Sequence, residues 1–551
     1  MGGPKQNMGS LFDKLCDSVA RAKRRWLLPD APLKSVFGRV TRLQVAVLAV
    51  LAGYLLIFSL VGIVYKTWIT PIKGSSEHNT RTGLGGFSDR IGALAYALTP
   101  FAVLLSNRES VLSLVTGIPY QHFNLIHRWL GRIIFVQSFV HTLGWTIVEG
   151  KLYRPQPSVH AEFMAQQYIV WGVLAMFFIT YLTVFSTKRA IACTGYEFFK
   201  ITHWGIALLY IGACWGHWAA LKCWMIPSIT LIFIDQGIRA LRLVYLHYNV
   251  NKERSRGFKA AQADVRVLGQ GDDVVLRLDF DHAHREAWKP GQHFYLTFPG
   301  LSIWQSHPFT PSSLPDINST IQHHTYLMRV RRGQTATLAA IAEQSKVSTV
   351  LTGPYGHGFP SFEAQHILAV AGGTGITFTL PIAFEALRQN VVPQACVDLV
   401  WVVRKAQDLL WISSELTQLK LMLKGCPGFR VSIFVTRESG KLGSGRSTPT
   451  LTEMDTEKGA VNASQASLQS DQSAMQGLLE PNSPRFSVRF LGDHHPSMAE
   501  IVEASMEHAT NAGGAVEIVG SGPDAMASDL RCAVARVKEN DGLNFYWDSR
   551  E

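Results

Sequence analysis

The hydrophobic positions of this chain are concentrated in its first half. Between residues 43 and 246 the sequence contains six nearly uncharged stretches, each about as long as a helix that crosses the hydrocarbon core of a bilayer. They lie at residues 43–65, 87–106, 127–148, 168–186, 200–220 and 224–246. Beyond residue 251 no comparable stretch occurs. We therefore expect a six-helix transmembrane bundle over residues 43–250, followed by a soluble half.

The soluble half changes its pattern once along its length. Residues 258–365 alternate apolar and polar positions with Pro-Gly turns at 290–291 and 299–300, which predicts a small antiparallel β-barrel. From residue 366 onward the pattern is apolar strand, loop and helix, with strands expected at 366–371, 397–403, 430–436 and 515–519. Such alternation predicts an α/β domain with a parallel, nucleotide-binding sheet over residues 366–551.

Two further features concern segments without a clear pattern. Residues 439–485 are rich in Ser, Gly, Thr and Gln and poor in large apolar residues, which predicts a disordered insertion. The seven cysteines show neither CxxC spacing nor a framework pattern, which argues against a zinc module or a disulfide scaffold. Cys214 and Cys223 lie at neighbouring ends of two predicted spans and could pair, but buried thiols are the simpler expectation.

Basic residues indicate the orientation of the chain in the membrane. Lys and Arg are concentrated in the arm at residues 1–42, between the fourth and fifth spans, and after the sixth. Under the positive-inside rule these segments are cytosolic, and so are both termini. The net charge of +11 is then mostly charge that flanks the membrane, and it requires no nucleic acid. Residues 8–28 form either a basic amphipathic helix on anionic lipid or a disordered tail.

Four histidines lie inside the predicted spans. His127 and His141 are 14 residues apart on the third span, and His203 and His217 have the same spacing on the fifth. Fourteen residues make almost four helical turns and rise about 21 Å, so each pair lies on one helix face. His127 should then face His203 at the inner side, and His141 should face His217 at the outer side. Two facing imidazoles are an axial-ligand set for haem. Polar contact between helices is the plain alternative, although ionisable groups in lipid are costly and usually functional.

Four short motifs follow in the soluble half. In chain order they are His307-Pro308-Phe309-Thr310, Gly353-Pro354-Tyr355-Gly356, Gly372-Gly373-Thr374-Gly375 and Gly520-Ser521-Gly522-Pro523. This ordered set is similar to the ferredoxin-reductase-type module. Joined to two helices with paired histidines, it resembles the ferric reductase/NADPH oxidase family, and most of all its fungal ferric-chelate reductases. The resemblance implies FAD, two haem b groups and NADPH as cofactors.

The resemblance also implies roles for single residues. Phe309 should lie against the flavin ring and Thr310 should hydrogen-bond its edge, which suits an aromatic face beside a polar rim. The remaining FAD residues, which face phosphate or shape the loop, are expected to be His307, Pro308, Arg329, Gly333 and Thr335. Cations and backbone amides at a helix start suit a pyrophosphate.

The NADPH residues are expected at two glycine-rich turns. A Gly loop between a buried strand and a helix permits close approach to a pyrophosphate. The resemblance assigns Gly372, Gly373, Thr374, Gly375, Gly520, Ser521, Gly522 and Pro523 to this site. Arg404 resembles the cation for the 2′-phosphate, with a solvated Arg at a strand end as the alternative. Ser521 stands where many relatives carry Cys, and Trp547 is one candidate to shield the flavin.

The implied function is that of a transmembrane ferric-chelate reductase, active on cupric ions as well, that serves iron uptake from the plasma membrane. It would oxidise cytosolic NADPH and reduce metal outside, with membrane lipid, ferric chelates and iron-uptake proteins as partners. The alternative is an NADPH oxidase that makes superoxide. Oxidases have an Arg on the second span and a second His one turn beyond the outer ligand, where this chain has residues such as Leu98 and Trp145. The short loop at 219–223 also favours a bulky chelate. The ordered motifs disfavour a haem-binding scaffold or transporter without enzymatic activity.

Overall fold

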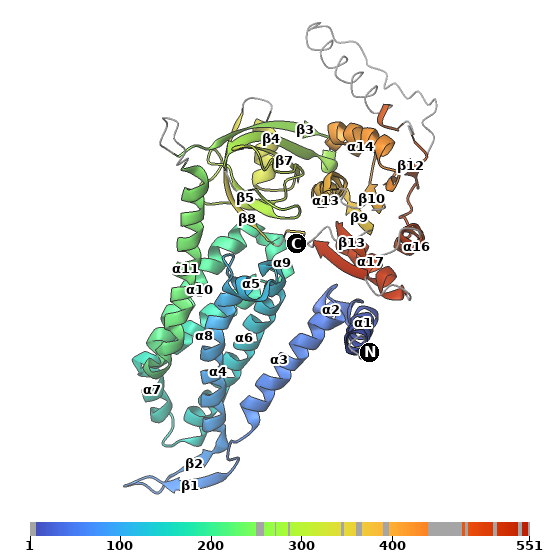
Figure 1. Ribbon diagram of the computed structural model, residues 1–551. Helices are drawn as coiled ribbons and strands as arrows, with labels where there is room; N and C mark the ends of the chain where they lie inside the picture. The colour runs from blue at the N-terminus through green and yellow to red at the C-terminus, as the bar shows by residue number, and fades with distance from the viewer. Residues whose placement is uncertain are drawn as a thin grey trace, which may run out of the picture. The chain divides into compact units, whose positions relative to one another are not determined.

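The computed structural model describes residues 7–248, 258–269, 271–284, 287–342, 346–356, 358–359, 366–389, 396–438, 477–479, 483–510, 515–537 and 543–548. The chain divides into two compact units (Figure 1). The membrane unit comprises residues Ala46–Tyr245, and the reductase unit comprises Met1–Val45 together with Leu246–Glu551.

Long helices dominate the membrane unit. They are α3 (Arg42–Leu60), α4 (Gly83–Ser106), α6 (Phe123–Ile147), α8 (Gln167–Phe185), α10 (Tyr196–His217) and α11 (Lys222–His247). Each predicted span therefore coincides with one of these helices to within a few residues. By length and composition alone, α3 and α8 are the two helices in the described part of the chain that could cross a membrane, and this is weak evidence by itself.

The helices of the membrane unit pack in pairs. Helix α4 lies along α6, and α8 lies along α10 (Figure 1). Their shared core contains Tyr96, Leu130, Ile134, Ile179 and Ile211, all at most 8% exposed. Apolar side chains at three- and four-residue spacing bring these helices together face to face. The pairing matters for function because α6 and α10 carry the four histidines.

Short elements connect the long helices. The sequence did not reveal the hairpin of β1 (Thr67–Pro71) and β2 (His78–Thr82), which pairs in antiparallel register. The others are α5 (Val111–Thr116), η1 (Tyr120–His122), a π-helical turn η2 (Val148–Leu152), α7 (Ser158–Ala165), α9 (Lys188–Thr194) and η3 (Ala219–Leu221). Cys214 and Cys223 are both free thiols, as expected, but only Cys214 is buried; Cys223 is exposed, so the expectation of a buried thiol is wrong for Cys223.

The first domain of the reductase unit is built on a six-stranded antiparallel sheet, and the second domain, described next, on a parallel one. Its strands are β3 (Ala261–Leu268), β4 (Val275–Ala283), β5 (His293–Thr297), β6 (His307–Phe309), β7 (Ile321–Arg329) and β8 (Val347–Tyr355). They follow the order β6-β5-β8-β3-β4-β7, and a bridge between Pro311 and Tyr326 joins the two edges. The sheet curls around a core that includes Leu276, Phe294 and Leu296. Helix α12 (Gln334–Ile341) connects β7 to β8.

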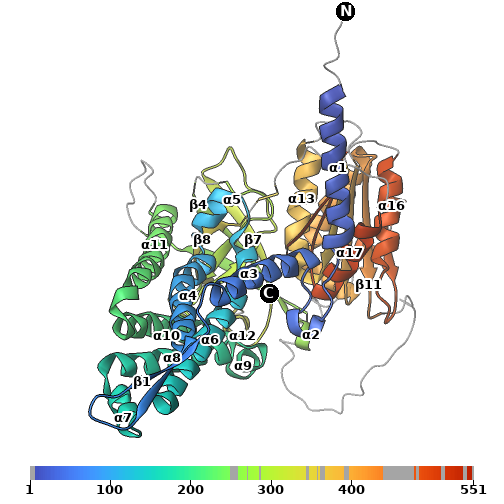
Figure 2. The same ribbon diagram turned by 90° about the horizontal axis from the view of Figure 1, so that it is seen from below.

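The second domain is built on a parallel sheet with helices on both faces (Figure 2). Its strands, in the order β12-β11-β10-β9-β13-β14, are Phe486–Phe490, Phe429–Val435, Cys396–Val403, His366–Gly372, Val516–Ser521 and Leu543–Asp548. Helices α13 (Ile376–Gln389) and α14 (Ser413–Gly425) share one core, and α16 (Met498–Thr510) and α17 (Asp524–Arg536) share the other. Strands β12 and β14 were not anticipated.

The arm at the N-terminus is helical and belongs to the reductase unit. Helix α1 (Asn7–Leu27) ends beside α17, where Arg24 donates a hydrogen bond to the Leu543 carbonyl at 3.2 Å. Asp30 accepts hydrogen bonds from Ser528 at 2.6 Å and from Arg531 at 2.7 Å. The disordered-tail alternative for residues 8–28 is therefore wrong, because α1 is ordered and its end is fixed by these bonds.

The predicted disordered insertion is too long at its C-terminal end. Residues 439–476 and 480–482 lie outside the described residues, so that part of the prediction stays a prediction. Residues 477–479 and 483–485 are packed on the sheet. Leu478 is 5% exposed, and Arg485 donates hydrogen bonds to the carbonyls of Leu423 and Cys426 at the end of α14. An apolar anchor and a helix C-cap thus order these residues.

Candidate functional site

The four histidines of the membrane unit form two facing pairs. The rings of His127 and His203 have their centroids 6.2 Å apart, and those of His141 and His217 are 6.1 Å apart. In both pairs the ring planes are steeply inclined to each other, at 69° and 83°. Helices α6 and α10 therefore bring together the residues that their sequence spacing pairs.

Each histidine is held through its Nδ1 atom. Nδ1 of His127 donates to the Ala102 carbonyl at 2.8 Å, and Nδ1 of His141 donates to the Ser88 carbonyl at 2.7 Å. Both carbonyls belong to α4. A carbonyl oxygen can only accept, so the proton of each ring is on Nδ1, and the lone pair on Nε2 remains for a ligand.

Helix α8 and Ser186, the residue after it, hold the two histidines of α10 in the same way. Nδ1 of His217 donates to the Tyr168 carbonyl at 2.7 Å. Nδ1 of His203 lies 3.2 Å from the hydroxyl of Ser186, which itself donates to the Leu182 carbonyl and therefore accepts from the ring. Metal-ligating histidines usually donate their other nitrogen in this way, which fixes the tautomer and the ring orientation.

The spacing within each pair fits a metal ion between the rings. Two metal–imidazole bonds of about 2 Å each, with the ring radius added at both ends, give a centroid separation of about 6 Å. Glycines make the approach of the outer rings possible. A Cβ atom at Gly92 would lie 2.5 Å from Nδ1 of His141, and one at Gly172 would lie 2.6 Å from the ring of His217. The donor set therefore fits two six-coordinate haem irons.

The flavin residues lie on β6 and around α12. Phe309 ends β6 and pairs in register with Phe294 of β5. Thr310, the next residue, is 3% exposed, and its hydroxyl has no hydrogen-bond partner within the described residues. Gln334, the first residue of α12, has both side-chain polar atoms in the same condition. Buried polar groups normally find partners, so these orphaned atoms fit a polar ligand such as the flavin edge and its phosphates.

Two other residues of the expected FAD set have partners in the protein. Gly333 precedes α12 with φ of 93°, a left-handed conformation that favours glycine. The hydroxyl of Thr335 accepts from the Arg331 amide at 2.9 Å and donates to the Arg331 carbonyl at 3.0 Å. Thr335 thus closes the loop before α12. His307 and Pro308 lie on β6, opposite Leu296 and Tyr295 of β5.

A carboxylate that the sequence did not reveal joins the two expected phosphate cations. Asp273 accepts from Arg329 at 3.1 Å and from Arg404 at 2.7 Å, and Lys405 lies 3.5 Å away. Partial burial alone would raise the pKa of Asp273, but the hydrogen bond from Arg404 and the nearby cations lower it below its usual range. A phosphate on either arginine would therefore have to compete with this carboxylate.

The two glycine-rich turns of the nucleotide domain pack against each other. Strand β9 ends at Gly372, which is followed by the turn η5 (Gly373–Gly375) and then α13. A Cβ atom at Gly375 would lie 2.1 Å from the Ser521 carbonyl, and one at Gly372 would lie 2.7 Å from Pro523. Thr374 lies within the same turn and accepts a hydrogen bond at its carbonyl from Thr377. Glycine is thus required for the contact of the turns, as well as for any ligand.

Three sequence families match the chain in this order. Residues 91–214 match the ferric reductase like transmembrane component, residues 257–358 match an FAD-binding domain, and residues 364–535 match the ferric reductase NAD binding domain. The chain belongs to the ferric reductase family. It is accordingly an integral membrane protein with FAD-binding and NAD-binding domains of ferredoxin-reductase-like type. Such a pair of domains is the equipment of an NAD(P)H-dependent oxidoreductase.

Fungal ferric reductases are among the curated proteins that this chain is similar to. Ferric/cupric reductase transmembrane component 2 of Saccharomyces cerevisiae is 26% identical over 52% of this chain and 38% of its own length. Ferric reductase transmembrane component 6 of the same yeast is 22% identical over 82% of this chain and 58% of its own. Probable cell surface ferric reductase kap2 of Aspergillus oryzae is 26% identical over 59% and 44%. The chain thus spans about half the length of these relatives.

Trp547, expected as a candidate to shield the flavin, lies in the core of the nucleotide-binding domain. Trp547 is 7% exposed and packs with Leu368, Val370 and Ile518 in the core beneath α16 and α17. Its ring fills the space over Gly520, where a Cβ atom would lie 2.6 Å from it. Trp547 is therefore a core residue and is not available as a flavin shield. Ser521, at the end of β13, is 8% exposed.

Proposed function

We propose that this member of the ferric reductase family is a transmembrane ferric-chelate reductase, with cupric ions as a second substrate class. It oxidises NADPH on the cytosolic side and reduces metal on the outer side of the plasma membrane, with both termini in the cytosol. Iron uptake is the process that such a reaction serves. When bound, FAD accepts a hydride and releases electrons singly, and haem b with two imidazole ligands carries single electrons.

The observation that carries this proposal is the pair of facing imidazoles at each of two levels. His127 and His203 would hold the inner haem, and His141 and His217 would hold the outer haem. The distance between the levels is four helical turns, or about 21 Å along each helix. Four histidines that are all fixed through Nδ1, in two facing pairs whose ring centroids lie 6.2 and 6.1 Å apart, are more than polar contacts between helices require.

The reductase unit supplies the residues for the other two cofactors. Phe309 and Thr310 would hold the flavin ring, and Arg329 and Arg404 would hold phosphates after exchange of their shared partner Asp273. The turns at 372–375 and 520–523 would hold the nucleotide. Backbone amides at the start of α13 suit its pyrophosphate. The preference for NADPH over NADH rests on Arg404, whose guanidinium is always charged.

The choice of acceptor follows from the outer end of the membrane unit. Trp145, one turn after His141, donates from Nε1 to Asp89 at 3.0 Å. Its indole N–H is therefore already engaged and is not available to an oxygen molecule beside the outer iron. Leu98 packs into the apolar core of the helices, one turn of α4 from Ala102 at the inner level, and offers no donor there. Two imidazoles also leave no open position on an iron. These features favour electron transfer at the edge of the site to a chelated metal over reduction of oxygen.

The decisive experiment uses intact cells that produce the protein and a ferric chelate that does not cross membranes. We expect reduction of the chelate, and its loss to the level of cells without the protein in His217→Ala. The matched control is His78→Ala, which removes an exposed histidine on β2 at a distance in sequence from either pair. Membrane abundance is measured for each variant.

Superoxide dismutase separates the two acceptors. If metal is the direct acceptor, added superoxide dismutase leaves chelate reduction almost unchanged, because no oxygen intermediate is needed. Strong suppression by superoxide dismutase would mean that superoxide reduces the iron, and the oxidase alternative would then hold.

A further inference from the structure

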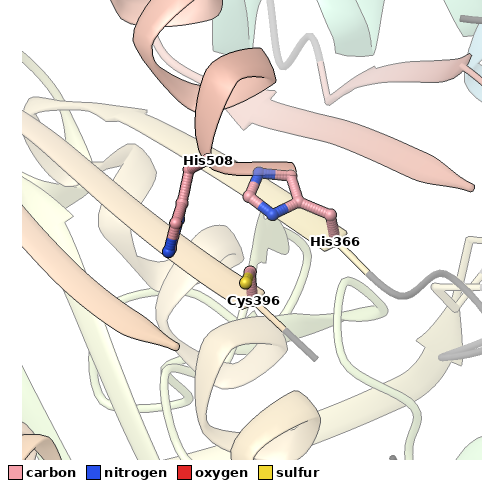
Figure 3. A group of neighbouring side chains, drawn as sticks. All are labelled: His366, Cys396 and His508. Carbon is pink, nitrogen blue, oxygen red and sulfur yellow. The ribbon is translucent and has the colours of Figure 1, made fainter. Parts of the chain in front are cut away.

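Three potential metal ligands meet at the end of the parallel sheet where strands β9 and β10 begin, opposite the end that carries the glycine-rich turns. His366 is the first residue of β9 and Cys396 is the first residue of β10, and the two are directly paired in the parallel register. His508 lies near the end of α16 (Figure 3). One ring nitrogen of each histidine and the Cys396 sulfur all lie within 4.8 Å of one another. The sequence does not reveal this group, because its members lie 30 and 112 residues apart.

A buried carboxylate lies behind the two histidines. Asp398, which follows on β10, lies 3.2 Å from Nδ1 of His508 and 3.4 Å from Nε2 of His366. Its side chain is 6% exposed and accepts two hydrogen bonds from Arg430 at 2.7 and 2.8 Å. Because both carboxylate oxygens pair with the guanidinium of Arg430, which is always charged, Asp398 is ionised. Asp398 is therefore a carboxylate that only accepts.

Ser505 fixes the proton of His366. Its hydroxyl lies 2.7 Å from Asp398 and must donate to that carboxylate. Nε2 of His366 lies 2.8 Å from the hydroxyl oxygen of Ser505 and must then donate its proton to it. The proton of a neutral ring at His366 is consequently on Nε2, and Nδ1 carries a lone pair. His366 is 1% exposed, and Nδ1 has no hydrogen-bond partner within the described residues.

The orientation of His366 completes the group. Figure 3 shows a ring nitrogen of His366 directed toward Cys396, with His508 on the other side of the sulfur. A buried lone pair without a partner is costly in a protein interior. A thiolate and two imidazoles are the donors that zinc prefers, and a carboxylate behind a ligating histidine is its usual support. Hydrogen bonds within the protein account for the buried oxygens of Asp398. They do not account for the buried lone pair on Nδ1 of His366.

We propose that His366, Cys396 and His508 bind one Zn²⁺, with Asp398 and Ser505 as the supporting shell. Ligands of a tetrahedral zinc lie about 3.5 Å apart, so the three donors must contract by about 1 Å. The His508 side chain, which is 20% exposed, provides the entry side and the freedom to move. Binding releases the thiol proton of Cys396 to solvent. The bound ion would tie together β9, β10 and α16, away from the glycine-rich turns and independently of the reaction proposed above.

Zinc stoichiometry tests the site directly. Purified full-length protein is equilibrated with Zn²⁺, dialysed, and assayed for zinc separately from haem iron. We expect one zinc per chain, and at least a tenfold weaker affinity in Cys396→Ser and in His508→Gln. His508→Gln changes a partly exposed residue and should fold even if Cys396→Ser does not. Cys426→Ser, which alters a partly buried thiol at the end of α14, is the control and should keep the zinc.

Thermal unfolding provides a second readout. Because zinc binds the folded site, it should raise the unfolding temperature of the wild type and of Cys426→Ser but not that of His508→Gln. Absence of stoichiometric zinc in the wild type would overturn the proposal. Zinc retained equally by Cys396→Ser and His508→Gln would also overturn it, because the ion would then be bound elsewhere.

Discussion

Two groups of histidines in this protein differ in how their rings are arranged. In the membrane unit the paired rings lie 6.2 and 6.1 Å apart and make no hydrogen bond to each other. In the second group, which lies in and beside the antiparallel sheet of the reductase unit, the rings touch. Nε2 of His282 lies 3.2 Å from Nδ1 of His247, and the Nε2 atoms of His284 and His324 are 2.9 Å apart.

The surroundings of the second group are those of a core. His324 stacks on Phe280 with centroids 5.2 Å apart and on Trp288 at 4.4 Å, and its Nδ1 lies 3.0 Å from the Tyr326 hydroxyl. Rings that bond and stack with each other leave no room for an ion between them. The burial and the number of histidines therefore do not identify a cofactor site. The membrane pairs are distinguished by a gap of about 6 Å between ring centroids, which suits a metal ion, and by the hydrogen bond that fixes Nδ1 of each ring.

The largest effect should come from closing such a gap. In Gly172→Val the new side chain would begin 2.6 Å from the ring of His217, so the ring must leave its position. We expect loss of the outer haem, with haem content falling to about half, while the inner pair is unaffected. Gly53→Val on α3 is the control, because a Cβ atom there meets nothing within 4 Å. Equal haem loss in both variants would indicate general damage to the helices.

A smaller effect should follow from removing a support. Ser186→Ala deletes the hydroxyl that accepts from Nδ1 of His203, whereas the other three histidines bond to backbone carbonyls. Loss of such a partner typically weakens a metal site by about 10- to 100-fold. We expect the inner haem to dissociate at least tenfold faster to a haem-scavenging protein, with the outer haem unchanged. An unchanged rate would show that the Ser186 contact does not support His203.

The smallest effect distinguishes the core group by pH. Burial and the neighbouring His247 and His284 lower the pKa of His282 to about 3, so the unfolded state binds more protons between pH 3 and 6.5. The contribution of His282 to the free energy of unfolding is therefore fully present above pH 6.5 and is lost as the pH falls. At pH 5.5 the loss for this one group is about 1.4 kcal/mol. Flavin release on heating measures the loss.

Two variants identify the group responsible. His282→Phe should flatten this pH dependence, while His323→Gln, which alters an exposed histidine on the neighbouring strand, should not. A dependence that persists unchanged in His282→Phe would assign it to other groups, such as His324, whose pKa is also lowered by burial.

Much of the fold could be read from periodicity. Apolar stretches located the long helices to within a few residues, and strand alternation separated the antiparallel sheet from the parallel one. The β1–β2 hairpin and the strands β12 and β14 escaped. Residues 78–82 carry almost no apolar side chains, and β14 is an edge strand whose pattern depends on packing against β13.

The candidate sites were predictable only where residues of one helix or one motif carry them. The spacing of His127 and His141 is a property of a single helix, so the sequence contained it. Asp273 lies 56 residues before Arg329 and 131 residues before Arg404, and no local pattern indicates that it joins them. The same holds for His366, Cys396 and His508. Nor could the sequence show that a Cβ atom at Gly375 would collide with Ser521.

Haem content per chain tests most directly whether the gaps between the membrane histidines hold two haems. By pyridine haemochrome assay the wild type should contain two haems b. His141→Ala should retain about one, the inner haem, and His127→Ala should retain about one, the outer haem. His282→Gln, in the group whose rings touch, should retain both. Two haems in His141→Ala or His127→Ala, or loss of haem in His282→Gln, would contradict the account.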